Sequence, residues 1–152
     1  MNQRYGPLQL DVPAELVDET LVVLRAPVPP PAVRMRVAAR ESLRPSFVIK
    51  RVPVVGDAAP ALEDVGAAEE RMLAATLDGF SVLARDVRTL AGRPTLVVEV
   101  SFDAPDGKLR QVHVTFVVEH TVLVFVATAL DDASFSAVRD QLLAMAATAQ
   151  LH

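Results

Sequence analysis

Few side chains in this sequence have the types and spacing that acid–base or metal chemistry requires. The three histidines, His113, His120 and His152, do not stand four residues apart, which is the spacing that sets two imidazoles on one face of a helix. The chain has no cysteine, so thiolate ligands, cysteine nucleophiles and disulfide bonds are excluded. We therefore expect no metal ion and no cofactor.

The carboxylates are no better arranged for catalysis. Glu69-Glu70 and Asp131-Asp132 are adjacent pairs, but neighbours on a helix point in different directions, and acids that precede a helix serve as caps. The glycines form no phosphate loop, and no serine stands in a Gly-x-Ser-x-Gly turn. We therefore predict a protein that is not an enzyme. The alternative, an acid–base pair of Glu99 with His113, requires the two side chains to lie close together.

The length and composition fit one globular domain covering residues 1–152. With 152 residues and 51% hydrophobic content, the chain has ample material for a core. A net charge of −4 argues against general nucleic-acid binding. Basic residues crowd the region between Arg25 and Arg51, but Phe47 is its one aromatic residue, so we interpret them as solvated strand faces and loops in preference to a phosphate-binding patch.

No segment has the character of a membrane span or an export signal. The longest apolar stretch, Val122 to Ala129, is far shorter than the roughly 20 residues that cross a bilayer. The chain runs from Met1 into the alternating segment Leu8 to Val12 without the apolar core of a secretory signal. We therefore expect a soluble, cytoplasmic protein with no direct membrane insertion.

Alternating apolar residues and turn signals predict a series of strands. The expected strands cover about residues 8–12, 20–25, 33–37, 47–52, 81–90, 94–102, 108–118 and 121–129. The proline-rich segment 27–31 is interpreted as a connector within the domain, because proline removes backbone donors. The last four strands are joined by connections as short as Glu119-His120, which predicts an antiparallel meander.

Two segments carry helical periodicity instead. The first begins near Pro60 and ends at Gly79, a plausible left-handed terminator that Phe80 covers. The second is started by Asp131, Asp132 or Ser134. It is expected to bury one stripe of side chains, Phe135, Val138, Leu142 and Met145. Strand runs with separated helices predict an α+β fold, an antiparallel sheet packed against two main helices.

The two faces of this sheet differ in polarity. Strand 108–118 sets Val112, Val114, Phe116 and Val118 against Gln111, His113 and Thr115. One face is therefore expected to be core, and the other mixed. A mixed face could receive a ligand or peptide, although an ordinary half-solvated sheet has the same pattern.

Several local strings, together with the order of elements over about residues 6–148, resemble the DcrB-related family, which includes the Eag chaperones of type VI secretion effectors. The strings are Leu8 to Pro13, Asp18 to Leu24, Ser46 to Arg51, Leu77 to Phe80, Ala91 to Pro94 and Leu123 to Ala129. The chain departs from the family where Leu16 and Val17 stand in place of a tryptophan, and in its long proline-rich insertion before Ser46.

The resemblance implies a fold like that of the Mog1 and PsbP domains. For Eag members it also implies a homodimer that shields the hydrophobic transmembrane segments of an effector in a sheet groove. Gln111 is similar to the family's strand glutamine, and its amide can both donate and accept hydrogen bonds. His113 lies two residues along the same strand. The candidate apolar wall is Leu21, Val23, Phe47 and Ile49.

Two interpretations therefore remain open at the level of function. The first is a non-catalytic, cytoplasmic chaperone or adaptor that binds hydrophobic segments of a secreted effector. The second is a generic DcrB-like module that binds a folded protein or a small ligand. For the candidate residues themselves, the alternatives are an exposed strand position for Gln111 and ordinary core for the apolar four.

Overall fold

In a computed structural model of the protein, the described residues are 2–5, 8–11, 17–20, 23–25, 45–54, 56–105 and 107–151. For the strands before residue 45 the backbone is described, and from residue 45 onward the side chains are described as well.

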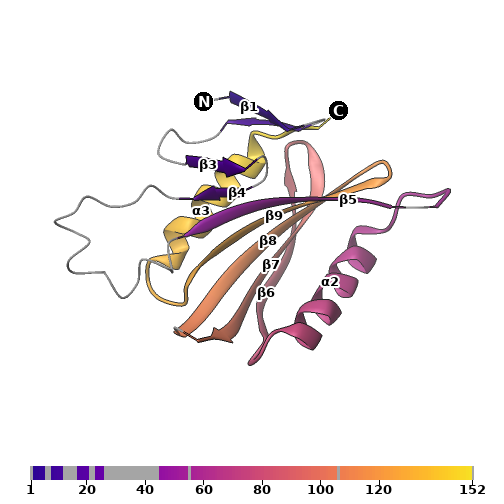
Figure 1. The fold of residues 1–152 in the computed structure, drawn as a ribbon. Helices are drawn as coiled ribbons and strands as arrows, with labels where there is room; N and C mark the ends of the chain where they lie inside the picture. Colours follow the sequence, from indigo (N-terminus) through magenta and orange to yellow (C-terminus); the bar gives the residue numbers. More distant parts are fainter. Residues whose placement is uncertain are drawn as a thin grey trace.

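The described elements alternate between strand runs and two helices (Figure 1). In chain order they are β1 (Asn2–Tyr5), β2 (Leu8–Asp11), β3 (Val17–Thr20), β4 (Val23–Arg25), β5 (Ser46–Pro53), α2 (Leu62–Thr76), β6 (Ser81–Leu90), β7 (Arg93–Ala104), β8 (Gly107–Val118), β9 (Thr121–Leu130), α3 (Phe135–Ala147) and β10 (Gln150–Leu151).

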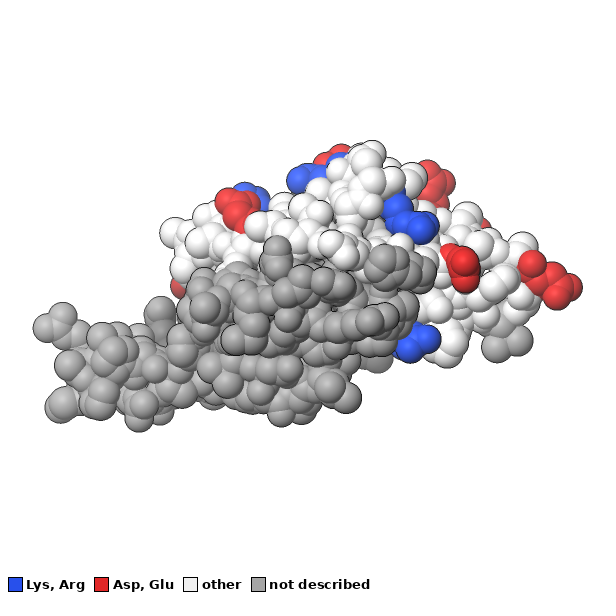
Figure 2. Space-filling model, turned by 90° about the horizontal axis from the view of Figure 1, so that it is seen from above, with Lys and Arg blue, Asp and Glu red and all other residues white. Residues whose placement is uncertain are grey.

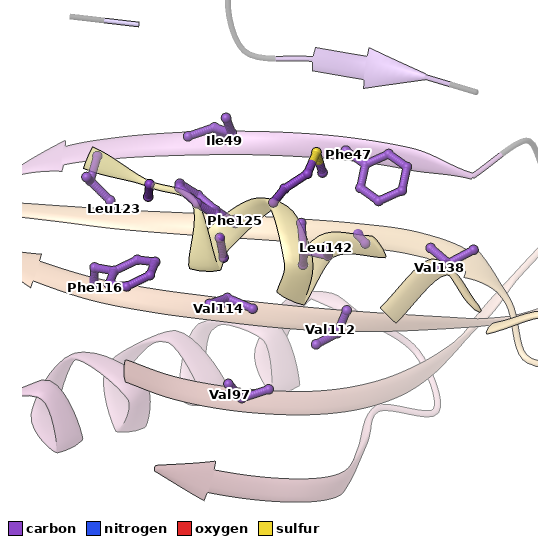
Figure 3. Packing of buried hydrophobic residues seen from close by; sticks show 14 of the residues in the cluster. Phe47, Ile49, Val97, Val112, Val114, Phe116, Leu123, Phe125, Val138 and Leu142 are labelled. Carbon is purple, nitrogen blue, oxygen red and sulfur yellow. The ribbon is translucent and has the colours of Figure 1, made fainter. Parts of the chain in front are cut away.

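The main sheet has seven strands in the order β3-β4-β5-β9-β8-β7-β6, and every neighbouring pair is antiparallel. A small sheet of order β1-β2-β10 joins the two ends of the described chain. Helices α2 and α3 lie on opposite faces of the main sheet (Figures 1 and 3). The fold is therefore α+β, as the sequence predicts.

Hydrogen bonds, acidic side chains and a glycine mark the ends of the two helices. Helix α3 starts after Asp132, whose Oδ1 accepts a hydrogen bond from the backbone N–H of Ser134 at 2.8 Å. Helix α2 carries Glu63 and Asp64 in its first turn, where negative charge complements the helix dipole. Beyond its last turn Gly79 has φ +61°, a conformation that glycine adopts without steric cost, so the expected left-handed glycine is confirmed. The helix itself ends earlier, at Thr76, because Leu77 is already extended.

The larger core lies between the sheet and α3 (Figure 3). All four side chains expected on the inner stripe of α3 are buried there. They pack against the residues of β5, β8 and β9 that point toward α3, including Phe47, Ile49, Val112, Val114, Phe116, Leu123 and Phe125. The rings of Phe116 and Phe125 are tilted by 60° with centroids 5.6 Å apart, a favourable aromatic geometry.

The opposite face is mixed, because antiparallel register combines the apolar side of β7 and β9 with the polar side of β8. His113 stands between Val98 on β7 and Val126 on β9. On the α3 face, its neighbour Val114 stands between Val97 and Phe125. Helix α2 covers part of the mixed face through Leu62 and Val65, which pack on the valines of β7 and β9.

The sequence predicts the long elements well and the short ones poorly. Strands β2 and β5 to β9, the antiparallel meander and both helices are confirmed. The single strand expected over 20–25 is wrong, since β3 and β4 form a hairpin there. Strands β1 and β10 were not predicted. The expected strand 33–37 and the connector 27–31 lie outside the described residues.

Candidate binding groove

A cavity of about 490 Å³ opens between α2 and the β5–β9 part of the sheet. It is lined by Lys50, Val52, Val54, Pro60, Asp64, Val65, Ala68, Glu69, Met72, Val122 and Val124. We call this cavity the α2 groove. Most of its lining is apolar, and this is the composition of sites that bind apolar ligands or helices.

Two periodicities build the walls of the α2 groove. The sheet wall alternates, because Val122 and Val124 of β9 face the groove while Leu123 between them faces α3. The helix wall uses Val65, Ala68 and Met72, whose spacings of three and four residues place them on one face of α2. The rim is open to solvent, since Met72 is 54% exposed.

Helix α2 approaches strand β7 closely at a glycine. Gly66 is its one buried residue among those described, and a Cβ at this position would collide with Cδ2 of Leu96 on β7. A glycine inside a helix costs about 1 kcal/mol relative to alanine. Here it permits a close approach between α2 and β7, which explains its presence in the middle of the helix.

A chain of hydrogen-bonded polar side chains runs from α2 along β8 to β9. His113 is 3% exposed; its Nδ1 lies 3.1 Å from Oε1 of Glu69, and its Nε2 lies 2.9 Å from Oε1 of Gln111. Gln111 Nε2 then donates to Oγ1 of Thr128 at 3.0 Å. As the Gln111 amide stands, both ring nitrogens of His113 face side-chain oxygens, and rotating this amide by half a turn presents an N–H donor to Nε2 instead.

Glu69 links this polar chain to the α2 groove. Burial raises the pKa of its carboxyl, but the hydrogen bond from His113, the charge of that ring and the charge of Lys50 outweigh burial and leave the pKa below its ordinary value. Glu69 and Lys50 both line the groove. The groove therefore combines apolar walls with the side chains of Asp64, Glu69 and Lys50.

The adjacent acid, Glu70, points to another strand. Arg85 of β6 donates from Nε to Oε1 of Glu70 at 2.9 Å, and its Nη2 pairs with the other carboxylate oxygen. Glu69 and Glu70 thus reach different partners on opposite flanks of α2, as expected for neighbours on a helix. Together they attach α2 to β8 and to β6.

The candidate residues from the sequence are divided between the two faces of the sheet. Gln111 and His113 lie on the face of α2, whereas Phe47 (1% exposed) and Ile49 (8% exposed) are buried in the core against α3. Val23 pairs with Val48 in the backbone register, and Leu21 lies outside the described residues. Gln111 therefore does not share one binding wall with Phe47 and Ile49. Alternate residues of a strand point to opposite faces, and Phe47 and Ile49 of β5 point toward α3.

The acid–base alternative is also separated by the sheet. Glu99 faces α3, where Nη1 of Arg139 donates to its Oε1 at 3.3 Å, while His113 faces α2. Among the described residues no group of three or more His, Asp or Glu side chains is placed to hold a metal ion. Likewise, neither described helix is long and apolar enough to cross a membrane.

Sequence reasoning missed most of the residues that line the α2 groove. Val65 and Met72 lie within the helix expected between Pro60 and Gly79, and Val122 and Val124 lie within the apolar strand expected over 121–129. For Val122 and Val124, the signal was that both alternating sides of β9 are apolar. Such a strand must be covered on both faces, but its covering partner is set by the fold.

Solved structures with the same architecture show the class of fold. LpqN of Mycobacterium tuberculosis, described as involved in cell envelope biogenesis, matches with a TM-score of 0.68 and 18% identity over 99% of this chain and 89% of that one. A Pseudomonas aeruginosa protein of unknown function matches with a TM-score of 0.63 and 18% identity, covering 95% and 93%. The cyanobacterial PsbP of Synechocystis matches with a TM-score of 0.63 and 11% identity, covering 96% and 87%.

The fold is thus the PsbP-like α+β class. Within that class, the sequence matches the DcrB family over residues 8–148, and the chain belongs to the DcrB family. No curated protein matches this sequence.

Proposed function

We propose that this protein is a non-catalytic binding protein whose α2 groove receives apolar side chains of another polypeptide. The groove itself is the observation that carries the proposal: about 490 Å³ between a helix and a sheet, with mostly apolar lining and an open rim. Apolar helices commonly bind by laying one face into such a groove.

The polar groups of the groove favour a polypeptide over a purely hydrocarbon ligand. Glu69 and Lys50 stand among the valines, and Gln111 and His113 lie behind Glu69 on the same face of the sheet. A client segment with small polar side chains can hydrogen-bond to such groups, which replace the contacts it makes with other helices in a bilayer.

The resemblance to Eag chaperones supports a finer proposal about the client. We infer that the client is a hydrophobic transmembrane segment of a type VI secretion effector, held by this chain in the cytoplasm before export. The generic alternative is a DcrB-like module that takes a small apolar ligand. It is favoured by the groove volume, because pockets for small ligands fall in the range of about 300–1,000 Å³.

Co-expression tests the proposal directly. The chain is expressed with the N-terminal hydrophobic segment of a type VI effector, and soluble complex is quantified by size-exclusion chromatography with light scattering. Met72→Glu places a charge at the groove rim, so we expect it to lower recovery of complex about tenfold or more. Ala75→Glu is the matched control, because Ala75 is also an exposed residue of α2 but does not line the groove.

The outcomes separate the candidates. Soluble complex with the original chain and with Ala75→Glu, but not with Met72→Glu, supports polypeptide binding in the groove. A segment that stays insoluble with every variant, while a small apolar fluorophore binds the original chain and not Met72→Glu, supports the small-ligand module. Equal recovery with Met72→Glu and Ala75→Glu places the binding outside the groove and contradicts the proposal.

A further inference from the structure

The carboxylate of Glu69 lies between the α2 groove and a buried imidazole. Glu69 is one of the residues that line the groove, and its Oε1 lies 3.1 Å from Nδ1 of His113. The side chain of Glu69 is 15% exposed, whereas that of His113 is 4% exposed. A ligand that fills the groove therefore removes water from Glu69 and leaves the surroundings of His113 nearly unchanged.

Among the described residues, the charged groups near His113 come from α2, β5 and β6. Glu69 and Glu70 of α2 line a small space beside the imidazole. Glu70 is already paired with Arg85 of β6, and Lys50 of β5 is an exposed residue whose charge acts on Glu69. The strands on either side of β8 place valines beside His113. The counter-charge that Glu69 can gain or lose near neutral pH is therefore that of His113.

Gln111 allows the imidazole to hold or release a proton without leaving an unsatisfied atom. Its Oε1 lies 2.9 Å from Nε2 of His113, and its Nε2 donates to Oγ1 of Thr128 at 3.0 Å. When the ring is neutral, the rotated amide donates to Nε2 of His113, and its oxygen accepts from the hydroxyl of Thr128. Both protonation states are satisfied on this side, so the electrostatic consequence of protonation falls on Glu69.

We propose that an uncharged apolar segment in the α2 groove is bound together with a proton at His113. Filling the groove encloses the carboxylate of Glu69, and a buried carboxylate is costly unless a positive group is paired with it. The protonated imidazole is such a group, and it lies at hydrogen-bond distance. The inference rests on the function proposed for the α2 groove and adds a pH dependence to it.

The coupling has a definite sign. With His113 protonated, its pair with Glu69 carries no net charge, whereas with a neutral ring the ligand encloses a carboxylate that lacks this adjacent counter-charge. The affinity for the ligand is therefore highest at low pH and falls as the pH rises through the titration of the imidazole. Glu69 stays ionised above about pH 5, because its pKa lies below its ordinary value. By linkage, ligand binding raises the affinity of His113 for a proton by the same factor.

Fluorescence titration with Nile red, an uncharged apolar probe, measures this coupling. Met72→Glu shows whether the probe binds in the groove, because Met72 lines the groove and is exposed. We expect the dissociation constant of the original chain to rise about tenfold between about pH 5.5 and about pH 8. The slope of its logarithm against pH gives the number of protons taken up with each ligand.

Two variants remove the coupling at either end. His113→Gln keeps hydrogen-bonding groups but cannot carry a charge, and Glu69→Gln leaves no carboxylate to compensate. Both are expected to bind the probe with an affinity that does not change over this pH range, and thermal unfolding shows whether each is folded.

His120→Gln is the matched control. His120 is exposed, and its backbone oxygen accepts a hydrogen bond from the N–H of Val54, which lines the groove. This variant removes a histidine near the groove that does not contact Glu69, so it is expected to retain the pH dependence.

A pH dependence that is present in the original chain and in His120→Gln, but absent from His113→Gln and Glu69→Gln, supports the proposal. Binding that Met72→Glu weakens but that is equal at both pH values, or a pH dependence that His113→Gln leaves unchanged, overturns the coupling while the groove function stands. Nile red that does not bind, or that binds Met72→Glu equally well, shows that the groove takes no uncharged apolar ligand and contradicts both.

Discussion

Glu69 and Glu70 are neighbours in sequence, yet the structure gives them separate tasks. Glu69 is hydrogen-bonded to the buried His113 and lines the α2 groove, while Glu70 pairs with Arg85 on the other flank of α2. On the face of the molecule seen in Figure 2, the described Lys and Arg are scattered among Asp and Glu. At the residue scale, individual pairs therefore matter more than any patch of one charge.

The contact of Glu69 predicts a pH dependence of stability. Its pKa is lower in the folded protein than its ordinary value, so the ionised carboxylate stabilises the fold above the unfolded pKa of about 4.3 and this contribution is lost as the pH falls through the folded pKa. Glu69→Gln is expected to cost about 1 kcal/mol at neutral pH and to flatten the fall in unfolding free energy below about pH 5.

Urea unfolding at a series of pH values measures this effect. Glu63→Gln is the control, because Glu63 is an exposed residue of the same helix. If Glu69→Gln and the original chain lost stability in parallel on acidification, the carboxylate of Glu69 would not be responsible.

At the element scale, the position of α2 on the sheet depends on a close approach at Gly66. Gly66 allows the helix to approach β7. Leu62 packs on the apolar cluster of β7, and Val65 packs on the valines of β9. The remainder of α2 is half-buried or exposed. The α2 groove exists because the helix contacts β7 closely while its flank toward β5 is left uncovered.

This close approach predicts coupling between Gly66 and Leu96. Gly66→Ala alone is expected to destabilise the protein, because overpacking of about 1–3 kcal/mol exceeds the helix propensity gained, about 1 kcal/mol. In a Leu96→Ala background the obstructing methyl group is gone, so Gly66→Ala is expected to become stabilising. A double-mutant cycle from urea unfolding measures the coupling. Additive effects would show that the helix does not rest on this contact.

At the scale of the whole molecule, the sheet separates the larger core from the candidate binding groove. The α3 face holds the larger core, and the α2 face holds the groove and the polar chain. Phe47 and Ile49 belong to the first face, and Gln111 and His113 to the second. Substitutions on the two faces should therefore change the unfolding free energy by different amounts.

Phe47→Ala tests this separation. Phe47 is fully enclosed in the core, so its truncation is expected to lower the unfolding free energy by about 3–5 kcal/mol. Met72→Ala, at the exposed groove rim, is expected to change stability by less than about 0.5 kcal/mol. Chemical unfolding of both variants measures the difference. A small effect of Phe47→Ala would instead restore this residue as a candidate for a binding wall.

The sequence by itself determined the long strands of the meander, both helices and the buried stripe of α3, because periods of two and of three to four residues are local properties of the chain. It also indicated the mixed side of β8. Only the tertiary structure decided which apolar side of β5 and β9 met α3 and which lined the groove. In β5, Phe47, Val48 and Ile49 are all apolar, so alternation alone could not assign them. Likewise, Glu69 and His113 are separated by 44 residues, and they meet because strand register and the position of Gly66 bring α2 onto β8, which no local pattern specifies.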